Sequence, residues 1–210
     1  MANKPEQTIT VGPARLSYAH LFKPYARDAS EEPRYSTTLL IPKTDIRSKQ
    51  LIDMAIEAAK QTGLVDQYQG VIPPVLATPV HDGDGVRVTD GMPFPPECKG
   101  HWVFTASSKN PPGILDQTKQ PIIRESEIYS GAYAYVSVTF FPYIAKGKKG
   151  VGCALNHVMK YQDGEPLAGG ISADAAFANI PVAGTSPAPF GGVPQTAVQY
   201  DPITGRPLGL

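Results

Sequence analysis

Residues 132–144, AYAYVSVTFFPYI, alternate between two kinds of side chain along the whole segment. Successive side chains of a β-strand point to opposite faces, so the alternation predicts one long strand with a buried face and an open face. The buried face would carry Ala134, Val136, Val138 and Phe140. The open face would carry Tyr133, Tyr135, Ser137, Thr139, Phe141 and Tyr143.

Proline and glycine divide the rest of the chain into short runs, with 22 prolines and 20 glycines among 210 residues. Short apolar runs bounded by these residues favour an all-β fold with long loops over a helical bundle. Further strands are predicted at 8–22, with a break or bulge at Pro13, and at 35–42, 101–108 and 151–161. Residues 146–150, KGKKG, would form the tip of a basic hairpin.

One main helix is predicted over residues 44–62. Apolar side chains recur there at helical spacing, at Leu51, Ile52, Ala55, Ile56, Ala58 and Ala59. Thr44 or Asp45 can cap the start, and Gly63 can take the left-handed position at the end. The expected role of this helix is to pack on one face of a barrel.

Two segments lack a regular pattern. Residues 63–100 form a long excursion rich in Pro, Gly and Asp, and such loops are usually either functional or additions specific to one family. Residues 171–210 hold six Pro, five Gly and few charges, a composition typical of a flexible tail. We therefore expect a folded domain at 1–170 and a flexible C-terminal tail at 171–210.

The open face of the 132–144 strand combines aromatic rings with a lysine cluster that follows directly. Single-stranded nucleic acid offers base faces for stacking and phosphates for cations, so this combination suits it. The formal net charge is zero, but residues 101–160 hold seven basic and three acidic residues, so a local basic face can exist. Alternatively, the aromatic row packs under a loop, a helix or a second subunit, because aromatic residues are favoured in strands in any case.

Two other segments offer weaker candidates for contacts with nucleic acid. Tyr18 and Phe22 alternate on the first predicted strand. Trp102 lies on the 101–108 strand with Lys109 just beyond it, although a lone tryptophan is more often part of the core.

Several blocks, in order from about residue 8 to 177, closely resemble a family of phage single-stranded DNA-binding proteins with an OB fold. The blocks are RLSYAHLFKPY, RYSTTLLIPKTD, GHWVFTASSKNPPGILD, IYSGAYAYVSVTFFPYIAKGKKGVGCALNHVMKYQDGEPLAGG and SADAAF. The family is distantly similar to the T7-type phage single-stranded DNA-binding protein. Proteins of this kind often end in an acidic tail that recruits partners, whereas this chain ends in the nearly neutral DPITGRPLGL.

The resemblance implies an OB-like barrel of five strands, sequence-tolerant binding of single-stranded DNA, and a role in phage DNA replication, recombination or repair without enzymatic activity. Candidate partners are single-stranded DNA, a second copy of the chain, and phage replication or recombination proteins. Strand periodicity and charge nominate the DNA-binding residues. They are Tyr133, Tyr135, Phe141 and Tyr143 for stacking, Lys109, Lys146, Lys148 and Lys149 for phosphates, and Tyr18, Phe22 and Trp102 as weaker candidates.

Three alternatives remain open. Cys98, His101, Cys153 and His157 have ligand-like spacings, and two Cys with two His could hold zinc. Asp82, Asp84, Asp90, Glu125 and Glu127 could hold magnesium in a metal-dependent nuclease, although DGDG and TDG are also typical of turns. An all-β virion structural or assembly protein would have the same composition. No cofactor is expected, because neither a GxSxG elbow nor a phosphate-binding loop occurs in the sequence.

The location predicted from the sequence is the cytoplasm of the host bacterium. Two cysteines do not form a disulfide framework, which favours a reducing compartment. The N-terminus MANKPEQT has no apolar core of a signal peptide, and no apolar run approaches the ~20 residues of a membrane span.

Overall fold

A computed structural model gives the fold of the chain and describes residues 6–167, apart from residues 27, 69, 74–75 and 146. The strands in this part are β1 (Thr8–Tyr25), β2 (Arg34–Pro42), β3 (His81–Asp82), β4 (His101–Ser108), β5 (Gly113–Leu115), β6 (Tyr133–Ala145) and β7 (Lys148–Gln162). The α-helix is α1 (Ile46–Asp66), and the 3₁₀ turns are Pro96–Cys98 and Glu125–Glu127. The expected tail at 171–210 lies outside the described residues, so the division at residue 170 stays a prediction.

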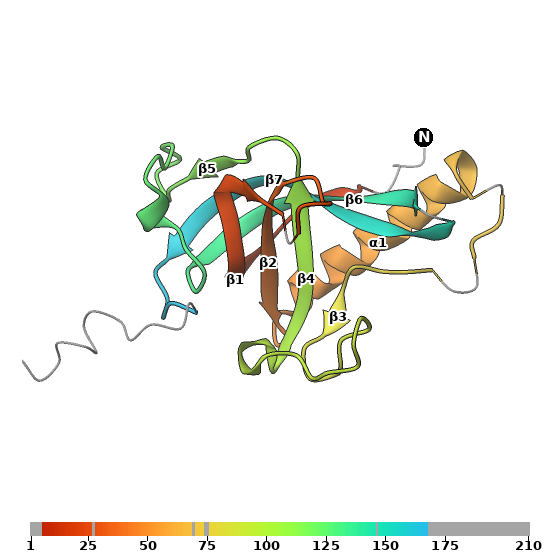
Figure 1. Cartoon of the computed structure of the whole chain (residues 1–210), viewed down its shortest axis with the longest axis horizontal. Helices are drawn as coiled ribbons and strands as arrows, with labels where there is room; N and C mark the ends of the chain where they lie inside the picture. The colour runs from red at the N-terminus through yellow and green to blue at the C-terminus, as the bar shows by residue number, and fades with distance from the viewer. Residues whose placement is uncertain (1–5, 27, 69, 74–75, 146, 168–210) are drawn as a thin grey trace, which may run out of the picture. The chain divides into compact units, whose positions relative to one another are not determined.

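Five of the strands close into a barrel (Figure 1). The strand order is β3-β4-β2-β1-β6-β7-β5, and β4 also pairs in parallel with β7, with Ser107 opposite Ala154. This last pairing joins the two ends of the β4-β2-β1-β6-β7 series, while β3 and β5 are short additions. The predicted five-stranded OB-like barrel with one main helix is confirmed.

The interior of the barrel is filled by the alternate residues of its strands. Ala134, Val136, Val138 and Phe140 of β6 have no solvent exposure, as the alternation in the sequence predicts. Phe140 meets Phe104 of β4 inside the barrel, with ring centroids 6.0 Å apart. The open face of β6 is therefore the outer wall of the barrel.

Helix α1 follows β2, precedes β3, and packs against β6, β1 and β7 (Figure 1). It starts as predicted, because the Asp45 carboxylate accepts a hydrogen bond from the backbone N–H of Ser48. The predicted end at Gly63 is wrong, since the helix continues to Asp66. The ring of Tyr68 packs against Gly63, where a Cβ atom would lie 2.3 Å from the ring. The glycine is needed for this close contact and does not end the helix.

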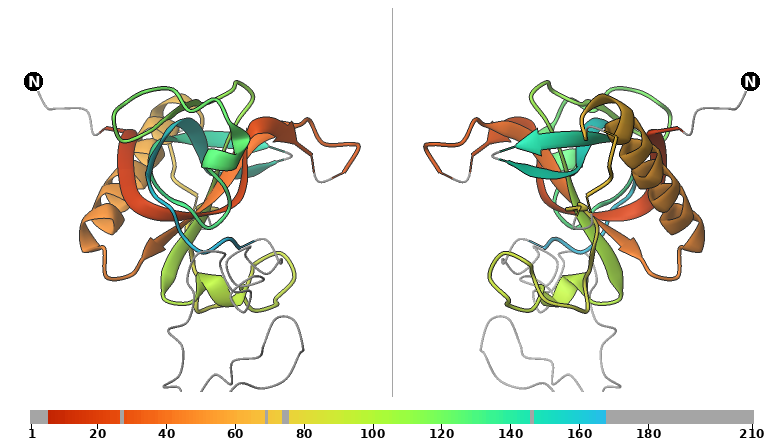
Figure 2. Two further views of the ribbon diagram at one scale, coloured as in Figure 1. Left: turned by 90° about the vertical axis from the view of Figure 1, so that its left-hand side faces the viewer. Right: turned by 90° about the vertical axis from the view of Figure 1, so that its right-hand side faces the viewer.

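Strand β1 is bulged in two places. The pairing with β6 shifts between Val11 and Ala14, around Pro13, which confirms the predicted irregularity. The pairing with β2 shifts between Ser17 and His20. Beyond this second bulge, the hairpin of β1 and β2 projects from the barrel (Figure 2).

The segment between α1 and β4 is long, and its second half, residues 76–100, lies against the barrel. A clamp at the base of this segment is formed by Lys43, whose Nζ atom lies 2.5 Å from Asp82 and 2.7 Å from Asp84. Asp84 also accepts a hydrogen bond from the backbone N–H of Gly100. Among the described residues, no helix is both long and apolar enough to cross a membrane.

Candidate nucleic-acid interface

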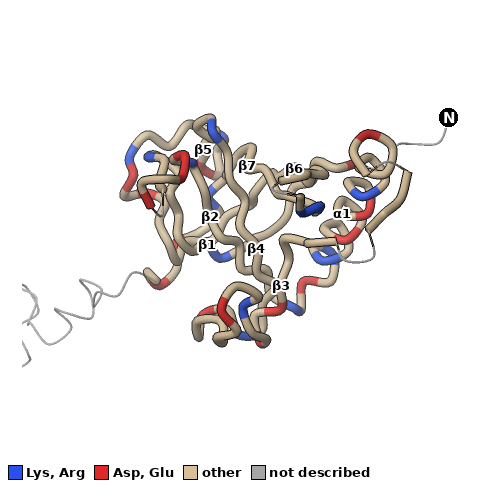
Figure 3. The backbone as a smooth tube through the Cα atoms, turned by 45° about the vertical axis from the view of Figure 1, so that its right-hand side comes forward, with Lys and Arg blue, Asp and Glu red and all other residues tan. Residues whose placement is uncertain are grey.

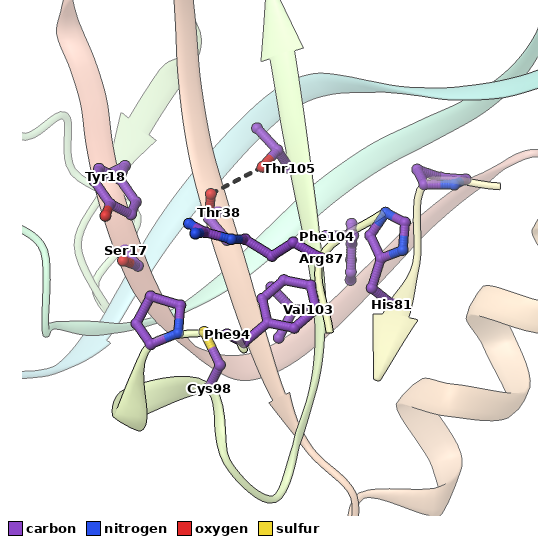
Figure 4. A pocket seen from close by; sticks show the side chains of 12 residues that line it. Ser17, Tyr18, Thr38, His81, Arg87, Phe94, Cys98, Val103, Phe104 and Thr105 are labelled. Atoms are coloured by element: carbon purple, nitrogen blue, oxygen red, sulfur yellow. Dashed lines mark hydrogen bonds between the residues drawn. The ribbon is translucent and has the colours of Figure 1, made fainter. Parts of the chain in front are cut away.

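The outer face of β1, β2 and β4 forms the floor of a hollow of about 380 Å³, walled on one side by the 76–100 segment (Figure 4). We call it the insertion hollow. Thr38 of β2 and Thr105 of β4 stand opposite each other on its floor, with hydroxyl oxygens 2.9 Å apart. The lining residues are Ser17, Tyr18, Thr38, Pro79, His81, Arg87, Phe94, Pro95, Cys98, Val103, Phe104 and Thr105.

Tyr18 stands at the edge of this hollow because of the bulge in β1. Its backbone lies in the left-handed region, at φ 48°, which costs a non-glycine residue about 1–3 kcal/mol. The bulge is held by a hydrogen bond from the Ala19 N–H to Ser130 Oγ and by another from the Thr37 hydroxyl to the Ser17 carbonyl. The Tyr18 side chain is 64% exposed. The fold thus places an aromatic ring in solvent beside the hollow.

Phe94 and Arg87 belong to the 76–100 segment, which forms the wall of the hollow. Phe94 is half-buried and packs against Leu40, Cys98 and Val103. Arg87 extends toward the barrel strands (Figure 4), and its guanidinium is held by Asp90 at 2.9–3.1 Å. Both side chains are therefore fixed by neighbours within the protein.

A second hollow, of about 320 Å³, lies where β6 and β7 run toward their hairpin. We call it the hairpin hollow. The aromatic rings of Phe141 and Tyr143 lie across the glycines opposite them on β7, Gly152 and Gly150. Because Gly152 has no Cβ atom, the ring of Phe141 can lie close to the backbone of β7, and the residue stays 40% exposed. The lining residues are Ala77, Thr78, Pro79, Thr105, Ser107, Phe141, Tyr143, Val151, Gly152 and Cys153.

The two hollows meet, because Pro79 and Thr105 line both. We call the joined hollows the barrel groove. Aromatic rings stand in both halves, with Tyr18 and Phe94 in the first and Phe141 and Tyr143 in the second. Exposed rings and hydroxyl groups in one open groove form a surface on which flat, polar-edged molecules can stack.

Lysines lie at the hairpin end of this groove. Lys148 is exposed at the start of β7. Lys149 is half-buried, with Nζ 3.5 Å from the Tyr68 carbonyl oxygen and 5.8 Å from the centre of its ring. Lys146 lies outside the described residues. Lys148 thus supplies positive charge where the groove reaches the hairpin, whereas the Lys149 ammonium lies beside Tyr68, which does not line the groove.

Lys109 is already paired. Its Nζ atom lies 2.7 Å from the carboxylate of Glu32, in the loop between β1 and β2, and Arg34 lies 3.9 Å from the same carboxylate. The hydrogen bond from Lys109 holds the pKa of Glu32 below its ordinary value of 4.5. A phosphate bound to Lys109 would have to compete with this carboxylate.

The aromatic residues of β6 that the sequence nominated for DNA binding do not lie on one surface. Tyr135 meets the ring of Tyr161 edge-on at 5.6 Å, and Tyr133 packs beside Gly164. At ~3.3 Å per strand residue, Tyr135 lies about 20 Å along β6 from Phe141. Neither Tyr133 nor Tyr135 lines the barrel groove. These two tyrosines therefore stay a separate prediction.

The weaker candidates Phe22 and Trp102 are partly buried and pack against the core. Trp102 lies beside α1, where the ammonium groups of Lys43 and Lys49 stand 5.2 Å and 4.7 Å from the centre of its ring. With these two cations near its ring, Trp102 belongs to the contact between the helix and the barrel. It does not line the barrel groove.

The residues of the zinc alternative do not come together. Cys98 is buried with Leu40 and Val103, whereas Cys153 belongs to the main core. Burial raises the pKa of both thiols, which disfavours the thiolate that zinc binds. His157 instead accepts a hydrogen bond from the Gly113 N–H. Within the described ranges, no group of three or more His, Cys, Asp or Glu is placed to hold a metal ion.

The carboxylates of the nuclease alternative each have a cation as partner. Asp82 and Asp84 share Lys43, and Asp90 binds Arg87. Glu125 binds Lys23, and Glu127 binds Arg124. A carboxylate in a salt bridge is neutralised within the protein, so these groups close turns and loops.

Sequence reasoning missed several residues of the groove. The Thr38 and Thr105 hydroxyls, Arg87 and Phe94 were not nominated. A signal for the threonines was available, since each alternates with buried residues on its strand. Phe94 lies in the Pro-rich excursion, where no periodicity indicates which way a side chain points.

The chain is similar to known proteins in family, sequence and structure. Residues 7–185 match a family described as that of the single-stranded DNA-binding protein of Enterobacter phage Enc34. The p50 protein of Acyrthosiphon pisum secondary endosymbiont phage 1 is 27% identical over 77% of this chain and 87% of its own length.

Solved structures agree with this match. The single-stranded DNA-binding protein of bacteriophage Enc34 in complex with single-stranded DNA is 32% identical, with a TM-score of 0.64 over 77% of this chain and 89% of that one. The same protein without DNA is 30% identical over 82% and 90%, also at 0.64. The gp2.5 protein of bacteriophage T7 is 17% identical over 86% and 98%, with a TM-score of 0.51, and supports the fold alone.

Proposed function

This chain belongs to the family of the Enterobacter phage Enc34 single-stranded DNA-binding protein, and on that premise we propose that it binds single-stranded DNA along the barrel groove. The binding is sequence-tolerant and involves no catalysis. The observation that carries this proposal is the series of aromatic rings, exposed or half-buried, in an open groove on the outer wall of an OB-like barrel. Unpaired bases present their flat faces for stacking, whereas paired bases in a duplex do not.

The position of the groove supports this function. OB folds bind oligonucleotides on the face of their second and third strands, between the loop after the first strand and the last hairpin. The corresponding elements here are β2, β4, the β1–β2 loop and the β6–β7 hairpin. Thr38 and Thr105 lie on that face, and Phe141 and Tyr143 lie beside that hairpin.

Each group of residues has its own role in this proposal. Phe141, Tyr143 and Tyr18 stack on bases, and Lys148 and Lys149 neutralise phosphates. Lys109 contributes after exchanging Glu32 for a phosphate. Lys146 would add to the charge of the hairpin. Tyr133 and Tyr135 would contact a strand that continues past the groove, and replacing both with alanine tests that role. Phe22 and Trp102 support the wall of the barrel.

The match to a phage family supports a proposed biological setting. A protein that covers exposed single strands serves phage DNA replication, recombination or repair in the cytoplasm of the host bacterium. Its partners there would be replication or recombination proteins of the phage, and a second copy of the chain on the same strand.

A salt-series titration tests the function. The protein is titrated against a fluorescent oligo(dT) of about 30 nucleotides, which spans more than one site at about 4–16 nucleotides per OB fold, and against a duplex of equal length. We expect tighter binding to the single strand and a loss of affinity as salt rises. Equal binding to duplex, or none at low salt, would overturn the proposal and favour a virion structural or assembly protein.

A further inference from the structure

The insertion hollow differs from the hairpin hollow in what its wall carries. The 76–100 segment contributes Ala77, Thr78 and Pro79 to the hairpin hollow, but an aromatic ring and a guanidinium to the insertion hollow. Its floor is the barrel face with Thr38 and Thr105, and the 76–100 segment brings Phe94 and Arg87 over one side (Figure 4). Its volume of about 380 Å³ falls in the range of about 300–1,000 Å³ that is typical of small-molecule sites. An open stacking surface needs no such wall, so the hollow calls for its own explanation.

We propose that the insertion hollow holds one nucleobase of the bound strand, turned out of the stack and placed against the ring of Phe94. This inference rests on the proposed function and deepens it. The ring is fixed in advance, because Phe94 packs against Leu40, Cys98 and Val103. A ring that is already fixed loses little freedom on binding, so its stacking contributes more fully to affinity.

The polar groups of the hollow suit a base edge. The hydroxyls of Thr38 and Thr105 lie 2.9 Å apart, and either can donate to the other. A hydroxyl both donates and accepts, so the pair can reverse its direction and meet either a donor or an acceptor on the base. The hollow can therefore take different bases, as sequence-tolerant binding requires.

Arg87 gives the hollow a flat guanidinium whose charge is paired with Asp90. Its Nε and Nη2 atoms are held by the Asp90 carboxylate at 3.1 Å and 2.9 Å. This anchoring leaves the flat faces of the guanidinium free of that contact, and an arginine plane stacks favourably on a base. An aliphatic ligand would gain nothing from either the guanidinium or the hydroxyl pair.

The test distinguishes contacts to the base from contacts to the phosphate backbone. Full-length protein and its Phe94→Ala, Phe94→Leu and Met92→Ala variants are titrated with oligo(dT) and with an abasic strand of equal length. Phe94→Leu keeps apolar volume against Val103 but removes the aromatic face. Met92 is an exposed side chain in the same segment and does not line the hollow, so Met92→Ala is the matched control.

We expect both Phe94 variants to bind oligo(dT) about 5- to 150-fold more weakly, the equivalent of one lost base stack. Their binding to the abasic strand should match that of the unaltered protein, and Met92→Ala should match it on both strands. Should Phe94→Ala fail to fold, judged by thermal melting, Phe94→Leu decides. Unchanged oligo(dT) affinity in a folded Phe94 variant, or an equal loss on the abasic strand, overturns the base site. The unaltered protein would still bind oligo(dT) in either case, so the proposed function is judged separately.

Discussion

The carboxylate of Glu32 forms a salt bridge with the ammonium of Lys109, as a DNA phosphate would. The two groups are 2.7 Å apart, and both side chains are more than half exposed. The Glu32 pKa is held below its ordinary value, chiefly by the hydrogen bond from Lys109, so the carboxylate is charged at neutral pH. If Lys109 binds DNA, the pair must open first.

Replacing Glu32 with glutamine should therefore tighten binding of single-stranded DNA. The charge of Lys109 is then free for a phosphate, and we expect a gain of about two- to fivefold at low salt, typical of an exposed ion pair. The gain should shrink as salt rises, because the competition is electrostatic. Titration of the Glu32→Gln variant with oligo(dT) measures it.

The control is Glu31→Gln, which removes the same charge from the same loop but leaves Lys109 paired. An equal gain in both variants would mean that only the net charge of the loop matters. In that case Lys109 is not a phosphate contact, and its nomination from the sequence would fail.

At the scale of elements, the sequence predicted the features that depend on the periodicity of side chains and on the length of a segment. The alternation of β6 placed Ala134 and Phe140 in the core correctly, because the strand is long and one face is buried. The helix was predicted from its spacing, and its start from Thr44 or Asp45, of which Asp45 is the cap. Strands β3 and β5 were not predicted, since two or three residues carry no period.

The candidate site was harder to predict, because it depends on how the elements come together. The bulge that turns Tyr18 outward has no signature in RLSYAHLF, since its cause is a pairing shift against β2. The aromatic row of β6 was predicted as one surface. The structure places Phe141 in the groove and Tyr135 against Tyr161, as the long strand passes different neighbours along its length.

The clamp at the base of the 76–100 segment should respond to acid. Hydrogen bonds from Lys43 lower the pKa of both Asp82 and Asp84 below their ordinary value of 3.8. Groups with a lowered pKa stabilise the clamp above that ordinary value, and the contribution is lost as pH falls through the lowered pKa. The clamp is therefore complete at neutral pH and opens only in acid.

Substituting Lys43 with methionine should raise the pKa of Asp84 toward 3.8, because its largest lowering influence is removed. The Gly100 amide donates to this carboxylate at 2.9 Å, so its NMR shift reports the titration. The Gln120 amide, which reports Asp116 in a separate turn, should titrate unchanged. An unchanged midpoint at Gly100 would mean that Lys43 does not hold the clamp in solution.

At the scale of the whole molecule, attraction to DNA must be local, because the formal net charge is zero. Basic and acidic residues are interspersed along the described chain (Figure 3). Most described cations have a carboxylate partner, and those outside the salt bridges found there are Arg15, Arg47, Lys99, Lys119, Lys148 and Lys149. Lys148 and Lys149 are the ones at the hairpin end of the groove.

The salt dependence of binding should therefore be set by a few positions and not by total charge. Each phosphate neutralised on a single strand contributes about 0.7 to the slope of log affinity against log salt. Lys148→Gln should reduce the slope by about that amount and weaken binding to all sequences alike. Arg47→Gln, on the exposed surface of α1, removes the same charge away from the groove and should leave the slope unchanged. Equal slopes for the two variants would instead indicate that the strand does not pass the β6–β7 hairpin, and would move the proposed path of the DNA away from the hairpin hollow.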